Sequence, residues 1–323
     1  MALQAEGNLS SFIVIIVVAI VLYLVYRFFI KGKKGSLLGA AKGLLGGAKS
    51  IASTSSKMLE GSALETRRSK RMRAATTDIG SGLAAVKDKL KQASANANFG
   101  EDVQGDVSEA LVGLEEKAAA EQSDILQARS SLEKIEQRLE TIEQSLSSQK
   151  SQVSRVEKTV VILGKIAEKQ GAGNITSVAA LVNAAETLKS DFASIESMVQ
   201  TAKTKIAKRS EIIGEAEERL RDIVGKLSGI KAILADNSEE VPLKRISKMV
   251  VGIDQTLSDL AALADKDGEF EKLCVQSEEV IQNLSAAMQK LPVDAKKVRN
   301  DVINVRAELK QHGAQALEAA AST

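Results

Sequence analysis

Apolar residues recur at alternating spacings of three and four along most of this chain, and this pattern limits the fold more than any other feature. From Val107 to Leu163 only Glu121 and Gln149 interrupt the apolar series. A hydrophobic period of 3.5 residues kept over eight heptads predicts long α-helices that pack as coiled coils. The chain has 2 Pro and no Trp, and only 2% of its residues are aromatic. This composition disfavours a dense core built on aromatic side chains, so we expect an all-α protein.

A second apolar series, out of phase with the first, runs from Val178 to Leu234 and carries Arg209 at one seam position. The residues between the two series, 170–174, are rich in Gly and end in Asn, which favours a turn. Residues 101–236 are therefore predicted to form two long helices joined at 170–174. An antiparallel hairpin is favoured, and a parallel homodimeric stalk is the alternative. The seam residues expected to be buried are Leu111, Ile125, Leu132, Leu139, Leu146, Val153, Phe192, Val199, Ile206, Ile213, Leu220 and Leu227.

Residues 237–312 are predicted to form three shorter helices. Pro242 suits the first turn of a helix, and the segment 265–268 ends in Gly and marks a turn. Pro292 is expected to interrupt the pattern once more, because proline removes a helical hydrogen bond and clashes with the preceding turn. Residues 313–323 are expected to be a frayed tail.

Residues 12–30 form the most apolar stretch of the chain and contain a single charged residue, Arg27. As a helix rising about 1.5 Å per residue they would span about 28 Å, close to the roughly 30 Å hydrocarbon core of a bilayer. Tyrosines and a snorkelling arginine near one end suit the lipid–water interface. We predict a single N-terminal transmembrane helix that includes Phe12, Ile16, Ile20, Tyr23, Tyr26, Arg27 and Ile30. A buried core helix is the alternative, but no other segment could enclose it.

The charges that flank this stretch predict its orientation. Residues 1–11 carry one charged side chain, Glu6, whereas Lys31, Lys33 and Lys34 follow the apolar run. The positive-inside rule then places residues 1–11 outside and the remainder in the cytoplasm, or in an equivalent interior such as that of a virion. The single cysteine, Cys274, excludes an intrachain disulfide and fits a reducing interior. We expect a single-pass membrane protein.

Residues 31–100 read as a basic juxtamembrane segment and linker rich in Gly, Ala and Ser. At about 100° per residue, the leucines between positions 37 and 45 fall on one helical face and the glycines lie opposite. This favours an amphipathic helix lying on the membrane surface. Glycines spaced four residues apart could instead let two helices approach closely. A flexible linker is the third interpretation, since each interior Gly costs a helix about 1 kcal/mol relative to Ala.

Five positive charges fall within the seven residues 67–73. Beside a membrane anchor, such a cluster can bind anionic lipid at about 1 kcal/mol per basic residue. Nucleic acid is the alternative ligand, but no aromatic residues are interleaved to stack on bases. A solvated linker without a ligand is the third interpretation. The residues predicted to contact the lipid surface are Lys31, Lys33, Lys34, Leu37, Leu38, Leu44, Leu45, Arg67, Arg68, Lys70, Arg71 and Arg73.

The sequence contains no pattern that indicates catalysis. It has no phosphate-binding or dinucleotide-binding glycine motif, no His/Cys ligand cluster and no nucleophile elbow. The only histidine, His312, lies near the end of the predicted helical region. We therefore expect no catalytic residues, no cofactor, no metal and no enzymatic activity.

These features predict a membrane-anchored coiled-coil structural or scaffold protein that tethers or spaces partners from a membrane. Its expected partners are anionic membrane lipid and a protein that binds through the coiled coil, most simply a second copy of the chain. One alternative is a virion structural protein linking an internal membrane to a capsid. A membrane-remodelling or curvature-sensing protein is another. A transmembrane signalling protein is disfavoured because residues 1–11 leave no room for a sensor domain outside.

Overall fold

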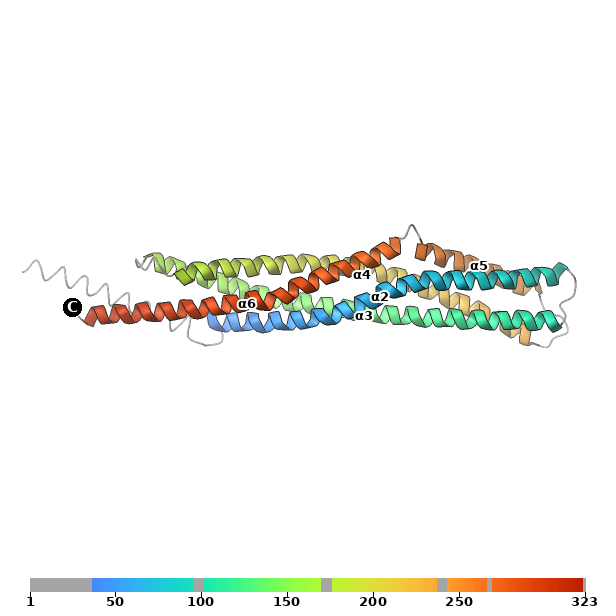
Figure 1. The fold of residues 1–323 in the computed structure, drawn as a ribbon, viewed down its shortest axis with the longest axis horizontal. Coiled ribbons are helices and arrows are strands. Elements are labelled where there is room, and N and C mark those ends of the chain that lie inside the picture. The colour runs from blue at the N-terminus through green and yellow to red at the C-terminus, as the bar shows by residue number, and fades with distance from the viewer. Residues whose placement is uncertain (1–36, 96–100, 170–175, 237–242, 266–268, 322–323) are drawn as a thin grey trace, which may run out of the picture. The chain divides into compact units, whose positions relative to one another are not determined.

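The computed structural model describes residues 37–95, 101–169, 176–236, 243–265 and 269–321. Over these ranges the chain forms α-helices and no strand (Figure 1). The helices are α2 (Leu37–Ala95), α3 (Glu101–Lys169), α4 (Thr176–Ala235), α5 (Leu243–Asp265) and α6 (Glu269–Ala321). The all-α prediction is confirmed. Among the described helices, none is long and apolar enough to cross a membrane, and the predicted span at 12–30, like residues 1–11, lies outside the described ranges.

The helices contribute to two compact units. Unit 1 contains the part of α2 that ends at Lys57, residues Glu140–Val199 and the part of α6 that begins at Asn283. Unit 2 contains Met58–Leu139 and Gln200–Gln282. Helices α2, α3, α4 and α6 therefore supply segments to both units, whereas α5 belongs to unit 2 alone.

Helices α3 and α4 are antiparallel within each unit. In unit 1, Lys189 of α4 pairs with Glu157 of α3 at 2.8 Å, and Glu196 of α4 pairs with Lys150 of α3 at 3.0 Å. The second pair therefore lies one heptad later on α4 and one heptad earlier on α3. In unit 2, the Arg129–Glu217 pair at 2.7 Å and a Glu115–Lys231 pair at 3.1 Å repeat this relation over two heptads. Within each unit α3 and α4 therefore pack as the antiparallel pair that a hairpin requires.

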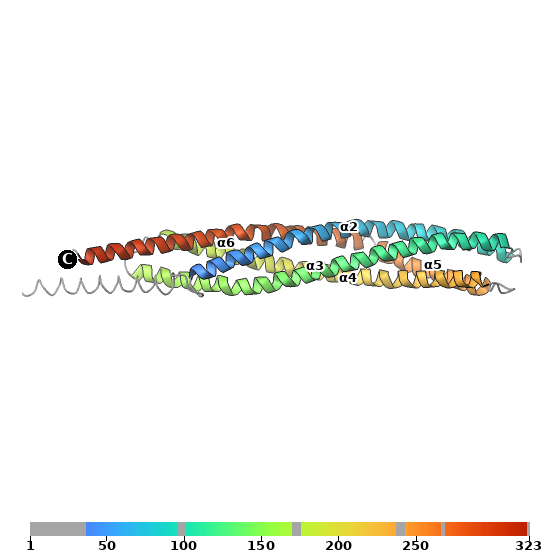
Figure 2. The same ribbon diagram turned by 90° about the horizontal axis from the view of Figure 1, so that it is seen from below.

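The other helices pack on this pair: over the described residues, unit 1 contains four helical segments with those of α2 and α6, and unit 2 contains five with those of α2, α5 and α6. In unit 1, the start of α2 packs on α3, and α6 pairs with α4 through Ser177 Oγ, which donates to Glu308 at 2.6 Å. In unit 2, α5 lies along the C-terminal part of α4, and the start of α6 contacts α4 through Arg209 and Ser277. Figures 1 and 2 show the helical segments of each unit lying lengthwise beside one another.

The interior of both units is built from the heptad positions. All twelve seam residues named above are buried, with Phe192 and Ile213 the most exposed at 6%. A fully buried Leu or Ile contributes about 1.5–3 kcal/mol, so these seams supply much of the driving force for folding. Because they are filled by helices of the same chain, a partner could use them only after the bundle had opened.

The C-terminal region differs from the prediction. Residues 237–312 contribute two helices instead of three, because α6 continues through Pro292 and reaches Ala321. Proline in a helix interior costs about 3 kcal/mol, but Leu291 and Ala295 on either side of it are fully buried. Their packing offsets the lost hydrogen bond. The expected frayed tail is also wrong as far as Ala321, in a stretch rich in the helix formers Ala, Gln, Leu and Glu.

Candidate functional site: polar residues and grooves of the bundle

Glu121 is a carboxyl group inside unit 2 at a seam position of α3. Its side chain is 6% exposed, and burial, with a smaller effect from Asp124, raises its pKa to about 7. Glu217 on α4 is equally buried, but it accepts hydrogen bonds from Arg129 and Arg221. Two arginines compensate the charge of Glu217, whereas desolvation disfavours the ionised form of Glu121.

Arg209 places a guanidinium inside unit 2. It is 1% exposed, and its Nη1 donates to Ser277 Oγ at 2.9 Å while its Nε has no hydrogen-bond partner. Ser277 Oγ in turn donates to the backbone carbonyl of Cys274. A buried cation bonded to a hydroxyl costs more than it contributes unless a counter-charge is supplied. The heptad pattern marked this position as irregular but could not show its partner.

The glycines of α2 allow close helix packing in unit 1. A Cβ atom at Gly43 would overlap the side chain of Gln152, and one at Gly47 would overlap that of Gln149, both on α3. Gln149 is itself buried. Gln149, a polar residue within the apolar heptad series of α3, thus lies opposite Gly47 of α2. Of the three interpretations of this region, close packing through glycines spaced by four is the one that the described residues adopt.

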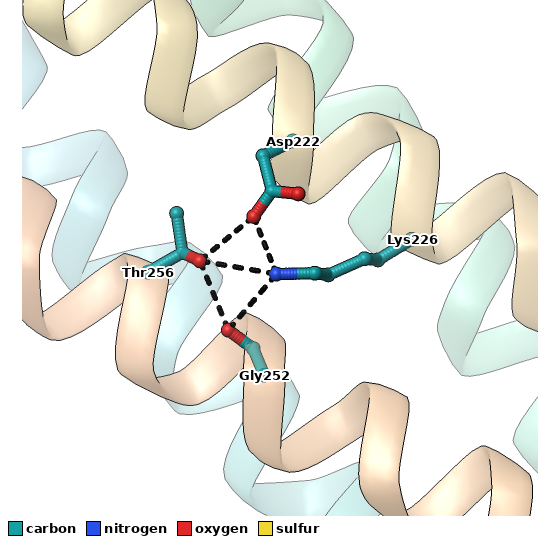
Figure 3. A network of polar contacts seen from close by, with 4 residues as sticks. All are labelled: Asp222, Lys226, Gly252 and Thr256. Atoms are coloured by element: carbon teal, nitrogen blue, oxygen red, sulfur yellow. Dashed lines mark hydrogen bonds and ion pairs between the residues drawn. The ribbon is translucent and has the colours of Figure 1, made fainter.

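A polar network links α4 to α5 in unit 2 (Figure 3). Lys226 pairs with Asp222 one turn earlier and lies 3.3 Å from Thr256 Oγ1, which donates to Asp222 at 2.9 Å. Burial alone would raise the pKa of Asp222, but hydrogen bonds from Lys226 and Thr256 lower it below the usual range. The i,i+4 Asp–Lys pair is visible in the sequence. The part played by Thr256 depends on how α5 docks and was not predicted.

Two carboxyl groups meet between α4 and α6 in unit 1. Lys290 Nζ lies 3.5 Å from Asp191 and 3.9 Å from Asp294. Burial, and then the neighbouring Asp191 carboxylate, raise the pKa of Asp294. One lysine between two acids makes this a compact ionic contact that fixes the two helices. Among the described residues, no three His, Cys, Asp or Glu side chains are grouped closely enough to hold a metal ion.

Two grooves separate α2 from α5 in unit 2. The larger has a volume of about 480 Å³ and is lined by small or hydroxyl side chains that include Thr76, Gly80, Ser258 and Ala261. The smaller, of about 160 Å³, lies between residues 87–91 and 243–251. An ion pair between Lys87 and Asp254 joins the two helices. No sequence pattern predicted these grooves, since they depend on the spacing of two helices more than 150 residues apart.

The predicted lipid contacts in α2 need correction at two positions. Leu37 and Leu44 are 2% and 1% exposed, and Leu38 and Leu45 are half-buried. The apolar face of this helix packs against protein in unit 1. The membrane interpretation had assigned the same apolar side chains to contact with lipid. Contact of Leu37 or Leu44 with lipid would require α2 to leave the bundle.

The basic residues predicted to contact lipid are only partly described. Arg71 is exposed on α2. Residues 67, 68, 70 and 73 belong to the same helix, but their side chains lie outside the described set, as do Lys31, Lys33 and Lys34. The binding of these cations to lipid stays a prediction.

Over the described ranges the chain consists of helices that pack in two units, with several polar residues in their interiors. Comparison of the chain with protein-family models, with curated proteins and with solved structures gives no match.

Proposed function

We propose that the chain is a membrane-anchored structural protein that holds partners at a membrane through the outer surface of its helical bundle. The observation that carries this proposal is the stretch 12–30, in which Arg27 is the single charge among nineteen residues. Its length matches the bilayer core, and basic residues follow it directly. The bundle that comes after it has long helices and polar outer faces, which suit a scaffold.

The packing of the bundle narrows how a partner would be held. The heptad seams are filled within one chain, so we propose that partners bind outside the seams instead of joining a homo-oligomer through them. The burial of Leu37 and Leu44 argues against membrane remodelling through that face, because those side chains are already engaged with protein.

Alkaline carbonate extraction of membranes tests the anchor. The full chain should remain with the membrane pellet, because an inserted helix resists extraction. The double variant Ile16→Asp/Ile20→Asp should move to the supernatant, since each charge near the centre of a span costs about 2.5–3.5 kcal/mol on insertion scales. A matched control, Leu126→Asp/Val161→Asp, introduces the same charges at exposed apolar positions of α3 and should stay in the pellet.

Release of the unmodified chain by carbonate would refute the anchor and with it the proposed function. Retention of the Ile16→Asp/Ile20→Asp variant would show that another part of the chain holds it to the membrane.

A further inference from the structure

The smaller groove between α2 and α5 in unit 2 is lined by apolar side chains from both helices and by two lysines of α2. Its floor includes Leu90 and Val250, which are 8% and 2% exposed, and Val251 at its edge is 60% exposed. Lys87 and Lys91 line the α2 side. Val251 is the most exposed apolar residue on α5 among the large side chains described there, and it lies beside a recess instead of on a flat surface.

Two further lysines lie on the exposed face of α5 near the groove. Lys244 and Lys248 precede Val251 by seven and three residues, which places them on the same helical face. Both are exposed, as is Lys91. Within the described ranges no carboxylate pairs with any of these three, whereas Lys87 pairs with Asp254. Lys91 therefore lines the apolar recess, and Lys244 and Lys248 lie on the exposed face of α5 near it.

We propose that this groove docks an acidic peptide segment of a partner protein, with one large apolar side chain of that segment seated over Leu90 and Val250. Charge complementarity favours carboxylates on either side of the apolar residue, one near Lys91 of the groove and the other near Lys244 and Lys248 on the exposed face of α5. An apolar anchor in a recess surrounded by polar contacts is the usual form of a peptide-binding hot spot.

The size and shape of the groove favour a peptide over other anionic ligands. A volume of about 160 Å³ is well below the roughly 300–1,000 Å³ of pockets that enclose whole small molecules, but it accommodates a single large side chain. A bilayer surface is flat and would meet the exposed lysines without filling the recess. The proposal concerns unit 2 alone and does not depend on the membrane anchor.

Fluorescence anisotropy tests the proposal with the full chain in neutral detergent micelles. The probe is a fluorescein-labelled synthetic peptide with the sequence Glu-Glu-Leu-Glu-Glu. We expect saturable binding that weakens at least fivefold when the peptide's Leu is replaced by Ala. Binding should weaken at least tenfold in the variant Lys91→Glu/Lys248→Glu and also in Val251→Glu. The matched control Lys117→Glu/Lys134→Glu makes the same charge change at exposed positions of α3 in unit 2 and should bind with unchanged affinity.

Equal affinity of the Leu and Ala peptides, or an equal loss in the control variant, would overturn the proposal because binding would then be non-specific attraction. A second measurement uses vesicles that contain phosphatidylserine. Vesicle binding that depends on Lys91 and Lys248, with no peptide binding, would overturn it in favour of a lipid surface. Circular dichroism at 222 nm should show that each variant is folded, as substitutions at exposed sites allow.

Discussion

Replacing Glu121 by Gln should increase the stability of the protein at neutral and alkaline pH and leave it nearly unchanged in acid. Glu121 is 6% exposed, and its pKa is raised to about 7 in the folded chain from an ordinary value of 4.5. The folded state therefore binds this proton more tightly than the unfolded state does. Between these two pH values the unfolded chain releases the proton first, so stability falls as pH rises through the window.

The size of the effect follows from the two pKa values. Each tenfold difference in proton affinity corresponds to about 1.4 kcal/mol, so ionised Glu121 costs about 3 kcal/mol above pH 7. Glutamine has the same shape and does not titrate. Glu121→Gln should match the wild-type chain near pH 4, where the carboxyl is protonated in both states, and exceed its free energy of unfolding by up to about 3 kcal/mol near pH 8.

Urea denaturation followed by circular dichroism at 222 nm, at several pH values from 4 to 8, measures this difference. The control is Glu116→Gln, which removes an exposed carboxylate from the same helix and should give a difference below about 0.5 kcal/mol at every pH. If Glu121→Gln were no more stable than the wild-type chain at pH 8, the argument from desolvation would be wrong, and an unrecognised cation would have to compensate the carboxylate.

Four further substitutions test the packing. Gly46→Ala should raise stability by about 0.5–1 kcal/mol, because nothing lies within 4 Å of the added Cβ and Ala favours helix. Gly47→Ala should lower stability, because its Cβ would displace the Gln149 side chain. Equal thermal midpoints for the two variants would contradict this reasoning. Arg209→Met should stabilise unit 2 by about 1–4 kcal/mol, as replacement of a poorly compensated buried charge does; a lower urea midpoint would mean that the guanidinium has a counter-ion. Pro292→Ala should raise the thermal midpoint, because alanine restores a backbone hydrogen bond of α6, with a gain in stability of up to about 3 kcal/mol. An unchanged midpoint would show that the helix is already interrupted there.

The heptad series predicted the α-helices and their buried faces well, because both depend on the local spacing of apolar residues. The register of α3 and α4 follows from the same spacing once the chain turns back, which explains why the hairpin could be preferred before any contact was known. The seam residues were identifiable for the same reason. Glu121, Gln149 and Arg209 were visible as irregular positions, but their surroundings depend on other helices.

The errors came from interactions that are not local. An apolar face such as that of Leu37 and Leu44 has the same pattern whether it meets lipid or protein, so periodicity could not choose between them. Pro292 has a known local cost, yet the burial of Leu291 and Ala295 outweighs it. The two grooves and the Thr256 contact depend on how α5 is placed against α2 and α4, for which the sequence offers no local signal.

Contacts between residues far apart in the chain also affect how the protein is made. Gln104 Nε2 donates to the carbonyl of Leu234, 130 residues later. At a synthesis rate of about 5–20 residues per second, the start of α3 leaves the ribosome roughly 6–26 seconds before its partner on α4 exists. During that interval its apolar stripe is exposed to water. We expect nascent chains that stop before α4 to bind chaperones or aggregate, and chains extended past Ala235 to become resistant to protease.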